Sequence, residues 1–313
     1  MSLPKTFISC DWGTSNFRLR LVNTSNLEVI AEHTTDVGVK KLHLNYKESK
    51  STESQTSYFV NYLKEQIKHL NSIGTTPIIV ASGMATSSIG MMELPYVDMP
   101  INFSGANLFS KTISENGLDL ILVSGAKTFD DVMRGEEIQA IGLSKHIPKN
   151  QEGVLLLPGT HSKHIHFKNG VFTHFTTYMT GELFDVISKN TLLANSLTKT
   201  DWSNDVESSF LEGVQKGLNN QSLTSLFSIR ANDLLQNKTP QQNFYFLSGL
   251  LIGGELAYLK QSHQQIYIAT TGILYKLYKL ALDQIHQNIV CFDADMIDKA
   301  LLIGHKKIVK SHV

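Results

Sequence analysis

The chain has 313 residues, which is long enough for two domains of ordinary size. Lys plus Arg and Asp plus Glu number 28 each, and this balance argues against nucleic acid or an anionic membrane surface as a partner. An apolar share of 42% with only 7 prolines predicts a compact globular protein. Cys10 and Cys291 each lie within an apolar run, so we expect two reduced, buried thiols and no disulfide.

The sequence predicts no targeting or membrane segment. The residues before Asp11 contain a single lysine and no long apolar stretch, unlike a signal peptide. The longest apolar-rich stretch, 244–259, is interrupted by Ser248, by three glycines and by Glu255, and it is too short to span a bilayer. We therefore expect a cytoplasmic protein without a membrane partner.

In chain order, the first half predicts the pattern β-β-β-α-β-α-β-α. Alternating and β-branched residues predict strands at 6–10, 17–23 and 28–34. A surface loop is expected at 47–57, and a helix at 54–71 that begins behind Ser54 or Thr56 as its cap. The remaining predicted elements are a strand at 77–81, a glycine-containing loop at 83–90, a helix at 104–114, a strand at 118–123 and a helix at 131–145.

The second half repeats this series with helices added. Its predicted elements are strands at 153–157, 163–168 and 171–176, a helix at 180–190, a helical block at 203–260, a strand at 265–269, a helix at 273–286, a strand at 289–292 and a helix at 295–311. Pro240 is expected at the start of the last long helix of the block. We predict two α/β domains, 1–148 and 149–313, with a helical insertion at about 195–262. Duplication explains the repeat better than chance.

Each half begins with a strand, a short polar turn and a returning strand. The turns are Asp11-Trp12-Gly13-Thr14-Ser15-Asn16 and Pro158-Gly159-Thr160-His161-Ser162-Lys163. Such turns point N–H groups and hydroxyls at one spot, which suits a phosphate chain. In the first turn Gly13 permits close approach, Thr14, Ser15 and Asn16 add donors, and Arg18 supplies positive charge. Asp11 is expected to hold Mg²⁺ through water. Taken alone, the first turn is better explained as an ordinary hairpin with Asp in a turn.

The duplicated layout resembles the actin-like ATPase superfamily, and further segments resemble its 2-dehydro-3-deoxygalactonokinase family. The segments that carry this resemblance are Asp11–Arg18, Gly83–Gly90 with Pro95-Tyr96, Val132–Glu137, Pro158–Lys163, Met179–Leu183 and Phe246–Gly253. They follow the family's order over nearly the whole length. The resemblance implies two ribonuclease H-like βββαβαβα domains with a central cleft. It also implies that ATP and Mg²⁺ are used to phosphorylate the C6 hydroxyl of 2-dehydro-3-deoxy-D-galactonate in galactonate catabolism.

The resemblance also implies roles for particular residues. The first turn and the second, with Gly159, Thr160, His161 and Lys163, would bind the phosphates of ATP. The second turn departs from the superfamily pattern because Leu157 stands where an acid often sits, and His161 and Lys163 would supply the polarity. Thr270, Thr271 and Gly272 resemble the adenosine motif.

A pair of glutamates opens the last helix predicted in the first half. A carboxylate there could accept the proton of the sugar hydroxyl, so the predicted base is Glu136 or Glu137, with Asp131 third. A solvated acidic first turn is the alternative. Arg134 is a candidate for the substrate carboxylate, although pairing with the glutamates is equally plausible. Ser87 and Ser88 are expected to shape the sugar pocket.

Two other functions stay open at this point. The Gly135-Glu136-Glu137 stretch resembles exopolyphosphatases, which hydrolyse phosphate chains, and a non-catalytic nucleotide or sugar sensor is the other alternative. Zinc binding by His161, His164 and His166 is less favoured, because no further cluster completes a ligand set. The epimer of the sugar acid and the oligomeric state are open, with a homodimer as one option.

Overall fold

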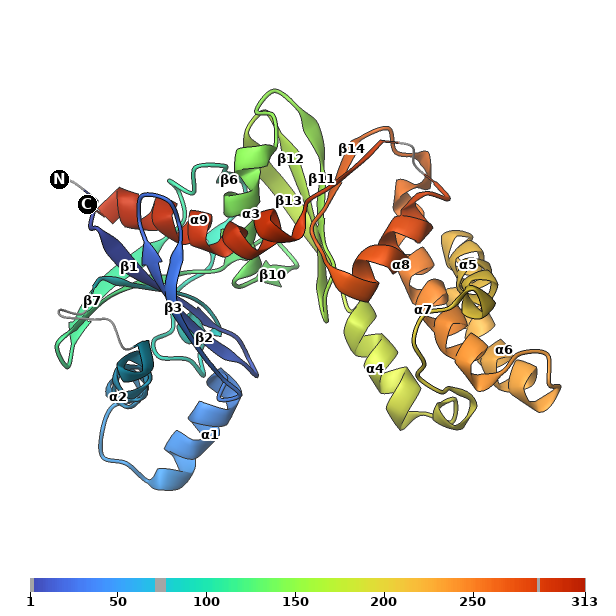
Figure 1. Cartoon of the computed structure of the whole chain (residues 1–313), viewed down its shortest axis with the longest axis horizontal. Helices are drawn as coiled ribbons and strands as arrows, with labels where there is room; N and C mark the ends of the chain where they lie inside the picture. The colour runs from blue at the N-terminus through green and yellow to red at the C-terminus, as the bar shows by residue number, and fades with distance from the viewer. Residues whose placement is uncertain (1–2, 71–76, 286–287, 313) are drawn as a thin grey trace. The chain divides into compact units, whose positions relative to one another are not determined.

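Three sheets organise the part of the chain that the computed structural model describes, namely residues 3–70, 77–285 and 288–312 (Figure 1). Contacts divide the chain into two compact units. Unit 1 comprises 1–151, 167–175 and 295–313, and unit 2 comprises 152–166 and 176–294. No helix in the described ranges is long and apolar enough to cross a membrane.

The first sheet has the strand order β3-β2-β1-β4-β8-β7. Its strands are β1 (Thr6–Trp12), β2 (Phe17–Asn23), β3 (Val29–Thr35), β4 (Ile79–Gly83), β7 (Ser110–Glu115) and β8 (Leu118–Val123). β1 pairs antiparallel with β2 but parallel with β4, which in turn is parallel to β8. The carboxyl ends of β1, β4 and β8 therefore share one edge of the sheet.

The second six-stranded sheet repeats part of this order. It runs β15-β14-β11-β12-β13-β6. The strands are β6 (Ile101–Asn102), β11 (Glu152–Leu157), β12 (Ser162–Lys168), β13 (Val171–Tyr178), β14 (Gln265–Ile268) and β15 (Ile289–Cys291). Three consecutive strands followed by two parallel ones, β3-β2-β1-β4-β8, thus have a counterpart in β13-β12-β11-β14-β15.

Two elements of the first half differ from the sequence prediction. The helix expected at 104–114 is wrong, because β7 and β8 form a hairpin around Asn116 and Gly117, which both have positive φ. Asn-Gly is a strong hairpin signal, and here it places the residues before it on a strand. The prediction also missed α1 (Val39–Ser49), whose last residues fall within the expected loop.

The other helices of unit 1 follow the prediction more closely. α2 (Gln55–Ile67) begins at the predicted cap, where the Ser57 amide donates to the Ser54 hydroxyl at 3.0 Å. α1 and α2 lie together beside the first sheet (Figure 1) and share its core around Trp12 and Phe59. α3 (Glu136–Leu143) is shorter than expected, because β10 (Val132–Met133) pairs with β9 (Ala126–Lys127) in a small sheet completed by β5 (Val97–Asp98). The C-terminal helix is α9 (Ala294–His312).

Unit 2 contains the predicted helical block. The helices of the block are α5 (Asn204–Leu218), α6 (Ser222–Leu234) and α7 (Pro240–Leu256). α4 (Thr180–Asn190) precedes the block and α8 (Gly272–Leu282) follows it. Pro240 occupies the first turn of α7 behind a capping box formed by Thr239 and Gln242, as its position predicted. α5 and α7 approach through glycine: a Cβ on Gly249 would lie 2.0 Å from the Phe210 carbonyl oxygen.

Both cysteines are free thiols, as predicted. Cys10 is fully buried within β1, and burial raises the pKa of its thiol. Cys291 is only half-buried because it lies on β15 at the edge of its sheet, so the expectation of burial is met in part.

Candidate functional site

The first turn lines a groove of about 690 Å³ in unit 1. The six candidate phosphate- and metal-binding residues of the turn and the start of β2 contribute to it: Asp11, Gly13, Thr14, Ser15, Asn16 and Arg18. Thr34, Thr35 and Asp36 of the neighbouring chain segment complete the lining. The groove therefore gathers hydroxyls, backbone and one Asp–Arg pair at the carboxyl end of β1.

The start of α1 holds this turn in place. The Val39 and Lys40 amides donate to the carbonyl oxygens of Gly13 and Thr14 at 3.0 and 3.2 Å. Gly38 has no room for a side chain, since a Cβ there would lie 2.4 Å from the Thr14 carbonyl oxygen. The first amides of α1 thus find their hydrogen-bond acceptors in the turn. The sequence prediction missed α1, yet this helix is part of the scaffold of the site.

Asp11 and Arg18 form a cross-strand pair. Arg18 Nη2 donates to Asp11 Oδ2 at 3.0 Å, and the two residues are register partners on β1 and β2. Their side chains are 39% and 35% exposed, so both remain within reach of a ligand in the groove. Among the residues with described coordinates, no group of three His, Cys, Asp or Glu side chains is arranged to hold a metal ion.

The start of α3 lies next to the ends of β1 and β4. A Cβ on Gly83, which has φ +80°, would lie 2.8 Å from the Trp12 carbonyl oxygen. A Cβ on Gly135 would lie 3.4 Å from Gly83 Cα. These close backbone approaches bring the predicted Gly135-Glu136-Glu137 segment to the same edge of the sheet as the first turn.

Glu136 and Glu137 have different surroundings. Glu136 is half-buried, and its Oε2 accepts from the Arg134 amide at 3.1 Å. Glu137 is 1% exposed, and its two oxygens accept from the Gly135 amide at 2.9 and 2.7 Å. Burial, reinforced by the charge of Glu136, raises the pKa of the Glu137 carboxyl to about 8.

Arg134 braces the loop after β4. Its Nη1 donates to the carbonyl and hydroxyl oxygens of Thr86, both at 2.6 Å, and its guanidinium lies 4.1 Å from the ring centre of Tyr96. Ser87 is buried and donates to the Met84 carbonyl at 2.8 Å, whereas Ser88 is exposed. Of these three predicted substrate contacts, Ser88 is the most accessible.

The second turn lies at the start of β12 in unit 2. The Gly159 amide donates to Ser162 Oγ at 3.4 Å, and Lys163 Nζ donates to the His161 carbonyl at the same distance. Thr160 and His161 are exposed, and the His161 ring pairs with Glu182. α4 begins against this turn: the Glu182 amide donates to the Thr160 carbonyl at 3.1 Å.

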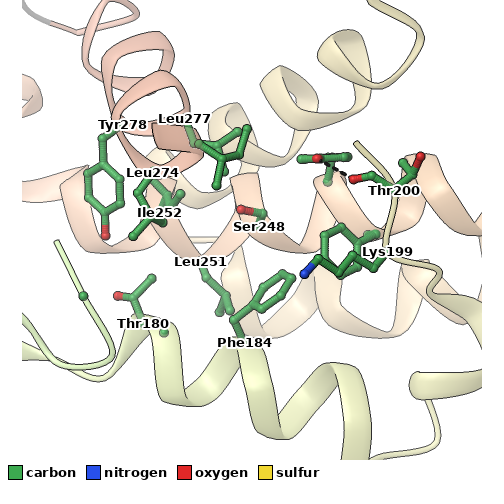
Figure 2. A pocket seen from close by; sticks show the side chains of 15 residues that line it. Thr180, Phe184, Lys199, Thr200, Ser248, Leu251, Ile252, Leu274, Leu277 and Tyr278 are labelled. Atoms are coloured by element: carbon green, nitrogen blue, oxygen red, sulfur yellow. Dashed lines mark hydrogen bonds between the residues drawn. The ribbon is translucent and has the colours of Figure 1, made fainter. Parts of the chain in front are cut away.

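An apolar pocket of about 200 Å³ lies beside the second turn (Figure 2). Its walls are side chains of α4, α7 and α8: Phe184, Phe244, Leu251, Ile252, Ile273, Leu274 and Leu277. Gly159 lies at its edge, and Figure 2 shows Thr180, Ser248 and Lys199 among the apolar side chains. The predicted adenosine residues Thr270, Thr271 and Gly272 lead directly into α8, where Gly272 adopts φ +62°.

Glu255 of α7 is a buried residue that the sequence reasoning missed. Its side chain is 1% exposed and lies within hydrogen-bond distance of His164, at 2.8 Å, and of the Tyr278 and Thr180 hydroxyls. The signal was present, because a lone carboxylate in a helix that is apolar on most sides needs buried partners. From the sequence alone, Glu255 is only an interruption of an apolar stretch.

A family model described as 2-keto-3-deoxy-galactonokinase matches residues 11–304. The chain belongs to this family. The galactonokinase resemblance read from the sequence is thereby confirmed, and the chain is a kinase.

Individual galactonokinase relatives agree with this assignment. A protein of Rhizobium meliloti named "Probable 2-dehydro-3-deoxygalactonokinase" is 30% identical over 94% of each chain. The 2-dehydro-3-deoxygalactonokinase of Escherichia coli is 29% identical, over 85% of this chain and 86% of its own. A crystal structure from Sinorhizobium meliloti, described as a candidate enzyme of that name, superposes with a TM-score of 0.82 at 28% identity and 97% coverage of both chains. The exopolyphosphatase-like alternative is not favoured.

Proposed function

We propose that this chain transfers the γ-phosphoryl group of ATP to the C6 hydroxyl of 2-dehydro-3-deoxy-D-galactonate, in galactonate catabolism. Membership of the 2-keto-3-deoxy-galactonokinase family over residues 11–304 carries this proposal. The groove at the first turn supports it, since its hydroxyls and its Arg suit a phosphate chain. A duplicated, actin-like architecture with domains at 1–148 and 149–313 is part of the proposal, and the common strand order supports it.

The adenosine of the nucleotide would bind in unit 2, in the apolar pocket beside the second turn. The pocket beside Gly159 has the apolar walls that an adenine ring needs, and the Thr270–Gly272 segment would contact the adenosine. Thr14, Ser15, Asn16 and Arg18 at one turn, and Thr160, His161 and Lys163 at the other, would contact phosphate oxygens. Lys163 Nζ donates to the His161 carbonyl, and because the residue is 4% exposed, its positive charge near the phosphates would be little screened by solvent.

Asp11 fits a role in holding Mg²⁺. Magnesium takes one or two protein carboxylates and completes its octahedron with water and substrate phosphates, so a single half-exposed Asp beside hydroxyls suffices. Bound there, the ion would neutralise the charge that develops on the phosphates during transfer. Arg18 would orient the Asp11 carboxylate through their 3.0 Å contact.

Glu136 is our choice for the carboxylate that accepts the proton of the C6 hydroxyl. An acceptor must reach the substrate, and Glu136 is half-buried whereas Glu137 is 1% exposed. Glu137 would instead hold the backbone at Gly135. The sugar-acid pocket would include Ser87, Ser88 and the loop that Arg134 braces, and Arg134 would bind the substrate carboxylate.

The test is ADP formation measured with ATP, Mg²⁺ and a panel of 2-keto-3-deoxy sugar acids. We expect ADP only when a sugar acid is present, and at least about 100-fold slower turnover for Asp11→Asn, since a metal contact of the transition state is weakened. Asp119→Asn, on the opposite edge of the same sheet, is the matched control. Phosphate release without any sugar acid would contradict the proposal.

A further inference from the structure

Glu255 sits at the centre of a buried polar network in unit 2. Its Oε1 lies 2.8 Å from His164 Nε2, and its Oε2 accepts from the hydroxyls of Tyr278, at 2.8 Å, and Thr180. His164 Nδ1 in turn lies 2.8 Å from the Tyr258 hydroxyl. One carboxylate of α7 thus joins β12, α8 and α4.

Two routes lead from this carboxylate to the second turn. One runs through hydroxyls: Tyr278 contacts Ser162 at 3.1 Å, and Ser162 accepts from the Gly159 amide at 3.4 Å. The other runs through α4: Thr180 is its first residue, and a Cβ on the next residue, Gly181, would lie 2.6 Å from the Gly159 carbonyl oxygen. Both routes end at the backbone of Gly159.

We propose that Glu255 is a positioning residue that fixes the second turn in the conformation that binds the phosphates of ATP. This inference rests on the proposed function, since it assigns the turn to phosphate. The carboxylate is needed because three donors converge on it. A glutamine amide has one acceptor oxygen and an NH₂ group. Turned toward the Tyr278 and Thr180 hydroxyls, the NH₂ group would face two donors, and turned toward His164 it would require the imidazole to move its proton from Nε2 to Nδ1.

The experiment compares ATP with adenosine as ligands of Glu255→Gln. Adenosine lacks the phosphates, so its affinity for the apolar pocket shows whether unit 2 is intact apart from the second turn. We expect the dissociation constant of ATP to rise at least about 10-fold and that of adenosine to change less than about twofold, because the loss falls on the turn. Calorimetric titration measures the dissociation constant of ATP, and displacement of bound ATP by adenosine measures the dissociation constant of adenosine.

A second variant keeps the test decisive if Glu255→Gln folds poorly. Tyr278→Phe removes the hydroxyl between Glu255 and Ser162 and keeps the ring that lines the apolar pocket, so we expect the ATP constant to rise about fivefold and the adenosine constant to change less than about twofold. Ser196→Ala deletes another fully buried hydroxyl of unit 2, bonded to Asp233 at 2.8 Å, and should leave the ratio of the two constants unchanged.

The outcomes separate the two claims. A lower melting temperature with an unchanged ratio of ATP to adenosine affinity would overturn the positioning role and leave the proposed function standing. Wild-type protein that binds no ATP would overturn the proposed function and this inference with it.

Discussion

Glu136 and Glu137 are neighbours in sequence, but their side chains meet different surroundings, and this difference predicts different roles. We expect Glu136→Gln to lower kcat at least about 100-fold with little change in KM, as the loss of a proton acceptor does. Glu137→Gln should lower kcat less than about 10-fold, since its side chain is 1% exposed. Steady-state kinetics of the two variants, each checked for folding by circular dichroism, measures the contrast. A reversed order would assign the base to Glu137.

The pKa of Glu137 predicts a pH dependence of stability. Its carboxyl has a pKa of about 8 in the folded protein against 4.5 as the ordinary value, so between these pH values the folded state binds more protons than the unfolded state. The resulting stabilisation is fully present below pH 4.5 and is lost as the pH rises through 8. Urea unfolding at pH 5.5 and 8.5 should show a larger fall in unfolding free energy for wild type than for Glu137→Gln. Equal falls would contradict the raised pKa.

The sequence indicates which candidate residues lie together where they are neighbours in the chain, but not where their contacts depend on folding. The six candidate residues at the first turn line one groove, because a hairpin places neighbours together whatever surrounds it. Glu255 was missed because its partners His164, Thr180 and Tyr278 lie on three other elements. No spacing along α7 indicates them. Arg134 likewise could be assigned a charge from the sequence but not the Thr86 carbonyl that it binds.

At the scale of elements, the contact between α5 and α7 depends on glycine. Gly249→Ala should lower the unfolding free energy by about 1–3 kcal/mol, because its Cβ would meet the Phe210 carbonyl at 2.0 Å and the helices would have to move apart. Gly254→Ala in the same helix is the matched control. Its nearest neighbour is the Ser222 hydroxyl, which can rotate away, while alanine favours the helix. If both variants lose similar unfolding free energy, the contact between the Cβ introduced at Gly249 and the Phe210 carbonyl is not the cause of the loss.

The elements themselves were predicted unevenly. The strands β1, β2 and β3 and the helices α4 and α9 lie close to their expected ranges, since each has a clear apolar period. β7 was read as a helix because its exposed edge position leaves little alternation, and only the Asn116-Gly117 turn identifies it. α1 has just two buried residues, Val39 and Leu42, so its period is too weak to detect.

For the whole molecule, the two six-stranded sheets share part of their strand order, and duplication of the domain stays a prediction. β3-β2-β1-β4-β8 and β13-β12-β11-β14-β15 share an order that one duplicated ancestor would produce. The domain limits at 148 and the insertion at about 195–262 stay predictions. Contacts group 295–313 with unit 1, a partnership that no local pattern in the sequence could indicate. Local periodicity identifies a helix or strand, whereas the elements that it packs against depend on how the whole chain folds.

The most direct test of the account is the proton-coupled ³¹P spectrum of the product formed from ATP and 2-dehydro-3-deoxy-D-galactonate. Carbon 6 of this acid carries two hydrogens, whereas each of the other hydroxyl-bearing carbons of the open-chain acid carries one. We predict a phosphate monoester signal split into a triplet by two equivalent protons. A doublet would place the phosphoryl group elsewhere on the sugar acid, and inorganic phosphate as the sole product would contradict phosphoryl transfer to the sugar acid altogether.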